Sequence, residues 1–158
     1  MTLHFAYGSN MSRPLMRARC PGAGEIGLAC LTGHRFTITP DGYASVVPAA
    51  GGVVHGVLWR LTPRDLAALN AYESLDRGLY VRRQLPVRHG GRQLRALVYI
   101  ATREGAGRPW PGYQDIVLAA ARDCGLPADY VRRLARFAPD RTDATAGAIA
   151  TATPGGER

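Results

Sequence analysis

The residues near the start of the chain that are best suited to chemistry are Gly8, Ser9 and Asn10, which follow a short apolar run at residues 3–6. A segment with helical character, residues 12–19, comes directly after them. Glycine lets backbone N–H groups approach a ligand without a Cβ in the way, and the N–H groups at a helix start attract anions. The loop therefore suits a small ligand with a carboxylate or a polarised carbonyl. The same residue types also form turns that have no further function.

A second candidate lies in a segment with clear signals for a helix start. Thr62 is a good N-cap, Pro63 fits the first helical position, and Asp65 stands at the third position, as in a capping box. Leu61 and Leu66 flank the cap at the spacing of a hydrophobic staple. The sequence therefore predicts a helix from residue 63 onward.

The candidate itself is Glu73, four residues after Leu69 and seven after Leu66, so helical periodicity places it on or beside the apolar face. A carboxylate in that position usually has a partner or a task, and its desolvation suits a general base. Two structural alternatives remain open. Glu73 could form an ion pair with an arginine such as Arg77, or it could lie exposed at a fraying helix end.

The composition bounds the class of protein. The chain has 158 residues, of which 46% are hydrophobic and 20% charged, as in an ordinary globular domain. No apolar run is long enough to span a membrane, and the first residues lack the regions of a secretory signal. We therefore expect a cytoplasmic protein without a membrane partner. Its folded domain is expected over residues 1–140, with a disordered tail over residues 141–158.

The cysteines and histidines give no support for a metal site. Cys20, Cys30 and Cys124 are widely spaced, and the sequence contains neither a CxxC nor an HxxxH motif. Reduced thiols are the simplest interpretation, in line with a cytoplasmic location.

All twenty basic residues are arginines, which excludes Schiff-base chemistry and a P-loop lysine. The net charge is +8, but the arginines are scattered and form only short pairs such as Arg82-Arg83. A nucleic-acid site would more often show a basic stripe with interleaved aromatic residues. We therefore interpret the charge as a solvated surface, with attraction of acidic small molecules as a secondary role, and expect no nucleic-acid partner.

The remaining elements alternate with glycine and proline. Apolar stretches predict short strands at residues 26–31, 35–38, 44–47 and 53–61. Residues 79–87 and 94–100 predict a hairpin about the Gly90-Gly91 pair. Two later helices are expected, one that begins at Gly112 or Tyr113 and ends at Gly125, and one that begins at Pro127.

These pieces, in this order, resemble the γ-glutamylcyclotransferase-like family. Its pattern is Tyr-Gly-Ser-Asn after the first strand, a Gly-Val-Leu-Trp-type strand, a helix that ends in Glu, and tyrosines in the strands and helix that follow. The matching residues are Tyr7 to Asn10, Gly56 to Trp59, Glu73, Tyr80, Tyr99, Pro109 to Tyr113, and Gly125 to Pro127 followed by Tyr130. The resemblance covers roughly residues 3 to 138, and the ordered set is more specific than its first motif alone.

The resemblance implies an α+β domain in which helices surround a small mixed β-barrel, for which the short strands suggest six or seven strands. It implies that Glu73 is the general acid/base. The residues implied to bind substrate are Tyr7, Gly8, Ser9, Asn10, Tyr80, Tyr99 and Tyr113. The implied reaction cyclises the γ-glutamyl group of a small γ-glutamyl amino acid or amine to 5-oxoproline and releases the amine, without a metal or cofactor.

Two positions depart from the family pattern. Asn70 stands where Asp is usual, which removes a charge near the base, and Ser74 stands where Gly is usual, which makes a left-handed helix exit less easy. Two other functions remain open: removal of a γ-glutamyl group from a specialised metabolite, and a non-catalytic binding module of the same fold. The retained loop and Glu73 argue against the second. The sequence does not choose the leaving group, because that selectivity depends on loops such as residues 103–112.

Overall fold

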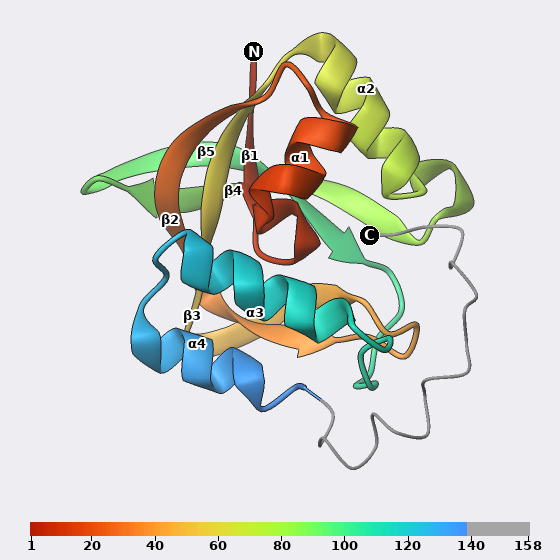
Figure 1. The fold of residues 1–158 in the computed structure, drawn as a ribbon, viewed down its shortest axis with the longest axis vertical. Coiled ribbons are helices and arrows are strands. Elements are labelled where there is room, and N and C mark those ends of the chain that lie inside the picture. Colours follow the sequence, from red (N-terminus) through yellow and green to blue (C-terminus); the bar gives the residue numbers. More distant parts are fainter. Residues whose placement is uncertain (139–158) are drawn as a thin grey trace.

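The computed structural model describes residues 1–138 as a β-barrel with helices packed around it (Figure 1). The strands are β1 (Thr2–Ala6), β2 (Gly24–Ile38), β3 (Ala44–Leu61), β4 (Tyr80–His89) and β5 (Arg92–Ala101). The helices are α1 (Arg13–Arg19), α2 (Pro63–Tyr72), α3 (Tyr113–Asp123) and α4 (Ala128–Ala135). The predicted tail at residues 141–158 lies outside the described residues.

The strands close into a barrel in the order β1-β3-β2-β4-β5. Neighbouring strands are antiparallel except at one seam, where β1 runs parallel to β5 with His4 opposite Leu97. The predicted hairpin is confirmed, because β4 and β5 pair from Tyr80 opposite Ala101 to His89 opposite Arg92. The mixed α+β barrel expected from the resemblance is therefore confirmed.

The predicted strand count was wrong, since residues 1–138 form five strands and not six or seven. The segments 26–31 and 35–38 are one continuous strand, β2, and the segments 44–47 and 53–61 are both part of β3. Gly33, with a φ of 73°, lies where the register shifts between Thr32 and His34. A β-bulge of this kind bends a strand pair without ending it. Gly33 is therefore a bend within a long strand and not a break between two strands.

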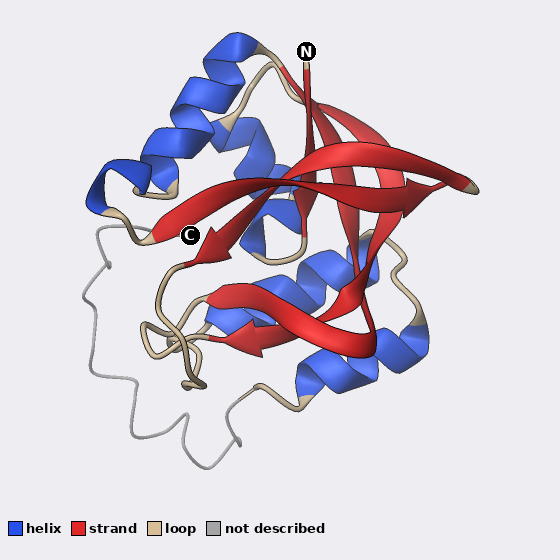
Figure 2. Cartoon of the chain, turned by 180° about the vertical axis from the view of Figure 1, so that it is seen from behind, coloured by secondary structure: helices blue, strands red, loops and turns tan. Residues whose placement is uncertain are grey.

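The helices lie on the outside of this barrel. α1 and α3 lie on the near side in Figure 1, and the view from behind brings the twisted strands to the front (Figure 2). α3 contacts α4 and the short 3-10 helix Ser9–Met11, while α1 contacts α2. None of the helices within residues 1–138 is long and apolar enough to cross a membrane.

The predicted start of α2 is confirmed in detail. The backbone N–H of Asp65 donates to Thr62 Oγ1 at 3.1 Å, and the N–H of Thr62 donates back to Asp65 Oδ2 at 3.1 Å. The second carboxylate oxygen of Asp65 accepts the N–H of Gly22 at 3.1 Å. The capping box therefore also ties the turn that follows α1 to the first turn of α2.

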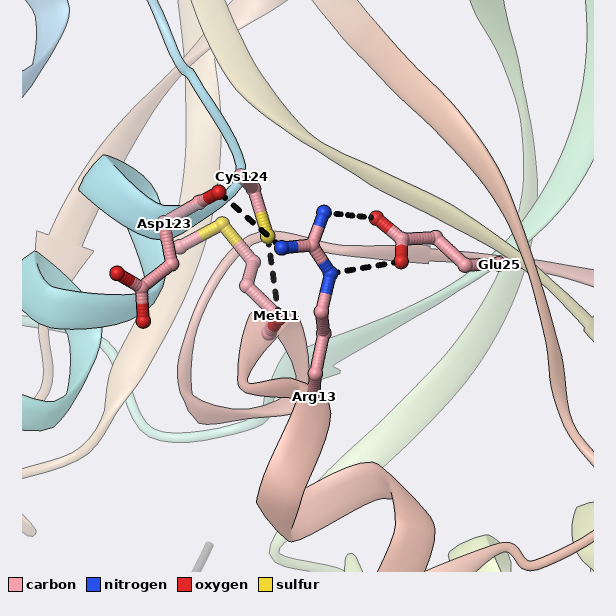
Figure 3. Close-up of polar contacts among 5 residues, drawn as sticks. All are labelled: Met11, Arg13, Glu25, Asp123 and Cys124. Atoms are coloured by element: carbon pink, nitrogen blue, oxygen red, sulfur yellow. Dashed lines mark hydrogen bonds and ion pairs between the residues drawn. The ribbon is translucent and has the colours of Figure 1, made fainter.

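Arg13, the first residue of α1, joins three parts of the fold (Figure 3). Its guanidinium donates to both carboxylate oxygens of Glu25 on β2, at 2.8 and 2.9 Å, and to the carbonyl of Asp123 at 3.1 Å. Beside it, the thiol of Cys124 donates to the carbonyl of Met11 at 3.5 Å. An exposed ion pair contributes little free energy, so the value of this contact is mainly positional. It holds the segment before α1 between the barrel and the end of α3.

Candidate active site

A narrow cavity of about 30 Å³ opens where β1 ends and the loop to α1 begins. The structure brings together in its wall all eight residues that the sequence and the resemblance proposed. These are Tyr7, Gly8, Ser9, Asn10, Glu73, Tyr80, Tyr99 and Tyr113. Four further lining residues were not predicted, namely His4, Phe5, Ala6 and Ala44.

The loop is built around a close approach at Gly8. A Cβ on this residue would lie 3.0 Å from the hydroxyl of Tyr113 and 3.2 Å from the Cβ of Ala44. After Gly8 the chain forms a single 3-10 turn, in which the N–H of Met11 donates to the Gly8 carbonyl at 3.0 Å. The first N–H groups of such a turn have no partner within it. These N–H groups are therefore left for partners outside the turn, and the backbone of Ser9 is hydrogen-bonded to Tyr113.

Glu73 is the C-cap residue of α2, and only 6% of its surface is exposed. Its backbone N–H donates to the Leu69 carbonyl at 2.9 Å, so the last helical turn fixes the start of the side chain. Its Oε1 accepts a hydrogen bond from Nδ2 of Asn10 at 3.1 Å. The predicted position on the buried face is confirmed, and the alternative of solvent exposure is wrong. The carboxylate faces the Gly-Ser-Asn loop.

The tyrosines of the cavity anchor their hydroxyls on the barrel. Tyr7 donates to the carbonyl of Tyr99 at 2.5 Å, and Tyr80 donates to the carbonyl of Ala44 at 2.9 Å. The hydroxyl of Tyr113 accepts the N–H of Ala44 at 3.3 Å. These bonds set the shape of the cavity wall.

Burial keeps these phenols protonated. It raises the pKa of Tyr113 to about 12, while the hydrogen bond from Ala44 acts in the opposite direction. The pKa of Tyr7 also lies well above its usual value, first because of burial and then because of the nearby Tyr80 and Glu73. At neutral pH such hydroxyls act as neutral hydrogen-bonding groups and not as bases.

His4 is a buried polar residue that sequence reasoning missed. Its Nδ1 lies 3.1 Å from the Leu97 carbonyl, which can only accept, so Nδ1 carries the proton and Nε2 is left as an acceptor. Nε2 is buried and has no hydrogen-bond partner among the described residues. Burial lowers the pKa of His4 to about 4, against a smaller effect of the Leu97 carbonyl. Both neighbours of His4 along the chain are apolar, so no local pattern marks it.

The two departures from the family pattern both have a structural role. The amide oxygen of Asn70 accepts the hydroxyl of Tyr99 at 2.6 Å, so this neutral side chain holds one wall of the cavity. Ser74 has φ 53° and ψ 47°, a left-handed conformation that is unfavourable for a residue with a Cβ. Ser74 was expected to make a left-handed exit from α2 less easy, but the chain makes this exit without a glycine.

The sequence pattern of the AIG2-like family matches residues 53–134. The chain belongs to the AIG2-like family. Among curated relatives of this AIG2-like chain, the gamma-glutamylcyclotransferase of Homo sapiens is 27% identical over 149 residues, which cover 87% of this chain and 79% of the relative. The gamma-glutamylcyclotransferase of Bos taurus is also 27% identical, with the same coverage.

Solved structures agree with this assignment. A gamma-glutamyl cyclotransferase superposes on the AIG2-like chain with a TM-score of 0.82, at 26% identity over 89% of each chain. YkqA from Bacillus subtilis superposes with a TM-score of 0.75 at 25% identity, covering 85% of this chain and 53% of YkqA. The family inferred from the ordered motifs is therefore confirmed.

Proposed function

We propose that this AIG2-like protein is a γ-glutamyl cyclotransferase that converts a small γ-glutamyl amino acid or γ-glutamylamine into 5-oxoproline and a free amine. The observation that carries the proposal is the buried carboxylate of Glu73, held by Asn10 at 3.1 Å against the Gly-Ser-Asn loop. The names of the relatives support the same activity.

In the proposed reaction Glu73 moves a single proton. The α-amino nitrogen of the substrate attacks the γ-carbonyl carbon, and Glu73 takes the proton that this nitrogen loses. The tetrahedral intermediate then collapses, the bond to the leaving nitrogen breaks, and Glu73 returns the proton to that nitrogen. One C–N bond forms and one breaks, so the reaction consumes neither water nor a redox partner.

The Gly-Ser-Asn loop would stabilise the negative charge of the tetrahedral intermediate. As the γ-carbonyl becomes tetrahedral, negative charge develops on its oxygen, and fixed N–H donors at the start of the Ser9–Met11 turn stabilise it. Gly8 makes this contact available, because a side chain there would fill the space beside Tyr113. The neutral tyrosines donate or accept hydrogen bonds without competing for the proton of Glu73.

The narrow cavity favours ring closure. The nucleophile and the carbonyl belong to one molecule, so folding the glutamyl chain into a five-membered geometry replaces an encounter between two reactants. Buried tyrosine rings on several sides favour such a folded conformer. The leaving nitrogen has to stay within reach of Glu73, and the identity of the group that it carries decides which compound is the natural substrate.

A panel of substrates tests the proposal. We expect release of 5-oxoproline, measured by mass spectrometry, from one or more γ-glutamyl amino acids, γ-glutamylamines or larger γ-glutamyl metabolites. The matched α-glutamyl compounds should remain intact, because their leaving group is not on the γ-carbonyl. Release of glutamate in place of 5-oxoproline would mean hydrolysis and contradict the mechanism. Binding without turnover across the panel would favour a non-catalytic module.

A further inference from the structure

Arg19, the last residue of α1, contacts both the Gly-Ser-Asn loop and the end of α2. One nitrogen of its guanidinium, Nη1, donates to the amide oxygen of Asn10 at 2.6 Å and to the hydroxyl oxygen of Ser9 at 3.2 Å. The other, Nη2, donates to the hydroxyl of Tyr72, the last residue of α2. The guanidinium carbon also lies 3.8 Å from the centre of the Tyr72 ring. One side chain thus joins the Gly-Ser-Asn loop to the helix that carries Glu73.

The chemistry of these groups fixes the direction of every hydrogen bond. A guanidinium can only donate, so the atom of Asn10 that faces Arg19 must be its oxygen. The amide nitrogen of Asn10 must then point the other way, where it donates to the carboxylate of Glu73 at 3.1 Å. A carboxylate can only accept, so the chain of donors and acceptors is consistent from end to end. In a flipped Asn10 the amide nitrogen would face the guanidinium of Arg19, which also only donates. The amide oxygen would then face the carboxylate of Glu73, which also only accepts.

We propose that Arg19 is a positioning residue of this site, which locks the amide of Asn10 so that its nitrogen faces Glu73. Arg19 does not line the cavity, and it acts on Glu73 through Asn10. The amide donates to the ionised form of the carboxylate, which is the form that accepts a proton. The catalytic consequence rests on the proposed function, whereas the positioning of Asn10 can be measured without any substrate.

Arg19 is placed to do this by the fold around it. The helix α1 is only seven residues long, and both of its ends are tied to other elements. Arg13 at its start bonds Glu25 of β2, and the turn after its end donates the Gly22 N–H to Asp65 at the start of α2. The last turn of α1 is therefore held against α2, which keeps the guanidinium within reach of both Asn10 and Tyr72.

Substitution of Arg19 by Met and by Lys, with Arg17→Met as the control, tests this inference. Arg17 is an exposed arginine in the same last turn of α1. For Arg19→Met we expect kcat/KM to fall by about 10- to 100-fold, mainly through kcat, because the base is no longer held in position. The acid limb of the pH profile should move to higher pH. Arg19→Lys should recover part of the loss, since it keeps the charge but not the planar fork of donors.

A measurement without substrate keeps the inference separate from the proposed function. NMR of the labelled protein follows the Asn10 side-chain amide and the titration of the Glu73 carboxyl carbon in all four proteins. We expect the Glu73 midpoint to move to higher pH in Arg19→Met and to stay in place in Arg17→Met. A folded Arg19→Met protein with an unchanged midpoint would overturn the inference, whatever its turnover.

The two kinds of failure are distinguishable. If the unsubstituted protein releases no 5-oxoproline from any compound of the panel, the proposed function fails and the NMR titration alone decides the role of Arg19. If the unsubstituted protein is active and Arg19→Met loses activity only in proportion to its folded fraction, Arg19 is a structural residue and the inference fails.

Discussion

The helices α2 and α3 are of similar length but are held to the protein in different ways. α3 buries six residues along its length, including the apolar Val117 and Leu118. α2 buries only Asp65 and Leu69, and it is fixed mainly at its two ends. At its start Asp65 bonds Thr62 and Gly22, and beyond its end the carboxylate of Glu73 accepts from Asn10.

This difference separates stabilisation from positioning. A buried apolar face contributes free energy in proportion to the area removed from water but tolerates small shifts of the helix. Hydrogen bonds at the helix ends contribute less but fix where the ends lie, because their geometry is directional. α2 carries the candidate base at one end, so the placement of that end matters more than the area that α2 buries.

The residues that follow the two helices also differ, because one adopts a left-handed conformation easily and the other does not. α3 is followed by Gly125, whose φ of 76° is easily adopted by glycine. α2 is followed by Ser74 at a φ of 53°, where a residue with a Cβ is strained. The exit of α3 is relaxed, whereas strain is retained immediately after Glu73.

The largest expected effect comes from replacing Glu73, the acid at the end of α2, by an amide. The same exchange at Asp123, the acid at the end of α3, is the control. Glu73→Gln keeps the shape and the contact with Asn10 but cannot accept a proton, so turnover should fall by roughly 10²- to 10⁴-fold. Asp123→Asn, at the exposed end of α3, should leave turnover unchanged. Turnover and melting temperature are measured on the same preparations. An active but destabilised Glu73→Gln protein would show that Glu73 is a structural partner and not the base.

The second effect is a pH dependence of stability due to His4. Its folded pKa of about 4 lies below the unfolded value of 6.5, so the unfolded chain binds more protons between these values. The contribution of neutral His4 to the free energy of unfolding is fully present above pH 6.5. It is lost as the pH falls toward 4, and the total loss is about 3 kcal/mol.

His4→Asn is the matched variant, because its amide nitrogen can still donate to Leu97 but does not titrate. Chemical denaturation at pH 7 and pH 4.5 should show a smaller loss of unfolding free energy in His4→Asn than in the unsubstituted protein. His34→Asn is the control, since its Nδ1 also faces a carbonyl, that of Thr32, in an exposed position. Equal pH dependence in His4→Asn and the unsubstituted protein would contradict the assignment.

The third test concerns Gly8, which lies beside Tyr113, the first residue of α3. Both residues line the same cavity as Glu73 at the end of α2. Gly8→Val adds atoms where a Cβ alone would already lie 3.0 Å from the Tyr113 hydroxyl. The added atoms would occupy space beside the loop that we propose holds the substrate. A loss of about 1–3 kcal/mol of binding free energy would weaken substrate affinity by roughly 10- to 100-fold in calorimetric titrations. Gly24→Val, where a Cβ would meet nothing within 4 Å, should bind normally. Unchanged affinity in Gly8→Val would exclude the loop from the binding site.

The smallest effects come from the two helix exits. Ser74→Gly should stabilise the protein by about 0.5–1 kcal/mol, because glycine adopts the left-handed conformation without strain. Gly125→Ala should destabilise it by about 1 kcal/mol through conformation alone, since its Cβ would meet nothing within 4 Å. Denaturant midpoints measure both. Changes of the same sign would mean that the contrast between the two exits is not conformational.

The sequence predicted the local parts of this architecture well. The capping box of α2 and the glycine after α3 could be identified because each depends on residues within a few positions of one another. The buried position of Glu73 followed from its spacing to Leu66 and Leu69. These features need no knowledge of the rest of the fold.

The parts that failed depend on contacts between distant residues. Gly33 looks locally like a turn, and only the pairing of β2 with β3 shows that the strand continues through it. The contact of Asn10 with Glu73 joins residues 63 positions apart, and the roles of Arg19 and His4 depend on neighbours from other elements. Periodicity and capping describe one element at a time, so they do not identify such partners.

The seam between β1 and β5 links the site to the opening motions of the fold. The two strands pair there only at His4 and Leu97, and side chains reinforce the contact through His4 to Leu97 and Tyr7 to Tyr99. A local fluctuation that parts this seam also moves two walls of the cavity, while the long β2–β3 ribbon stays paired. We therefore expect amide hydrogen exchange to report opening at this seam before it reports opening of the β2–β3 ribbon.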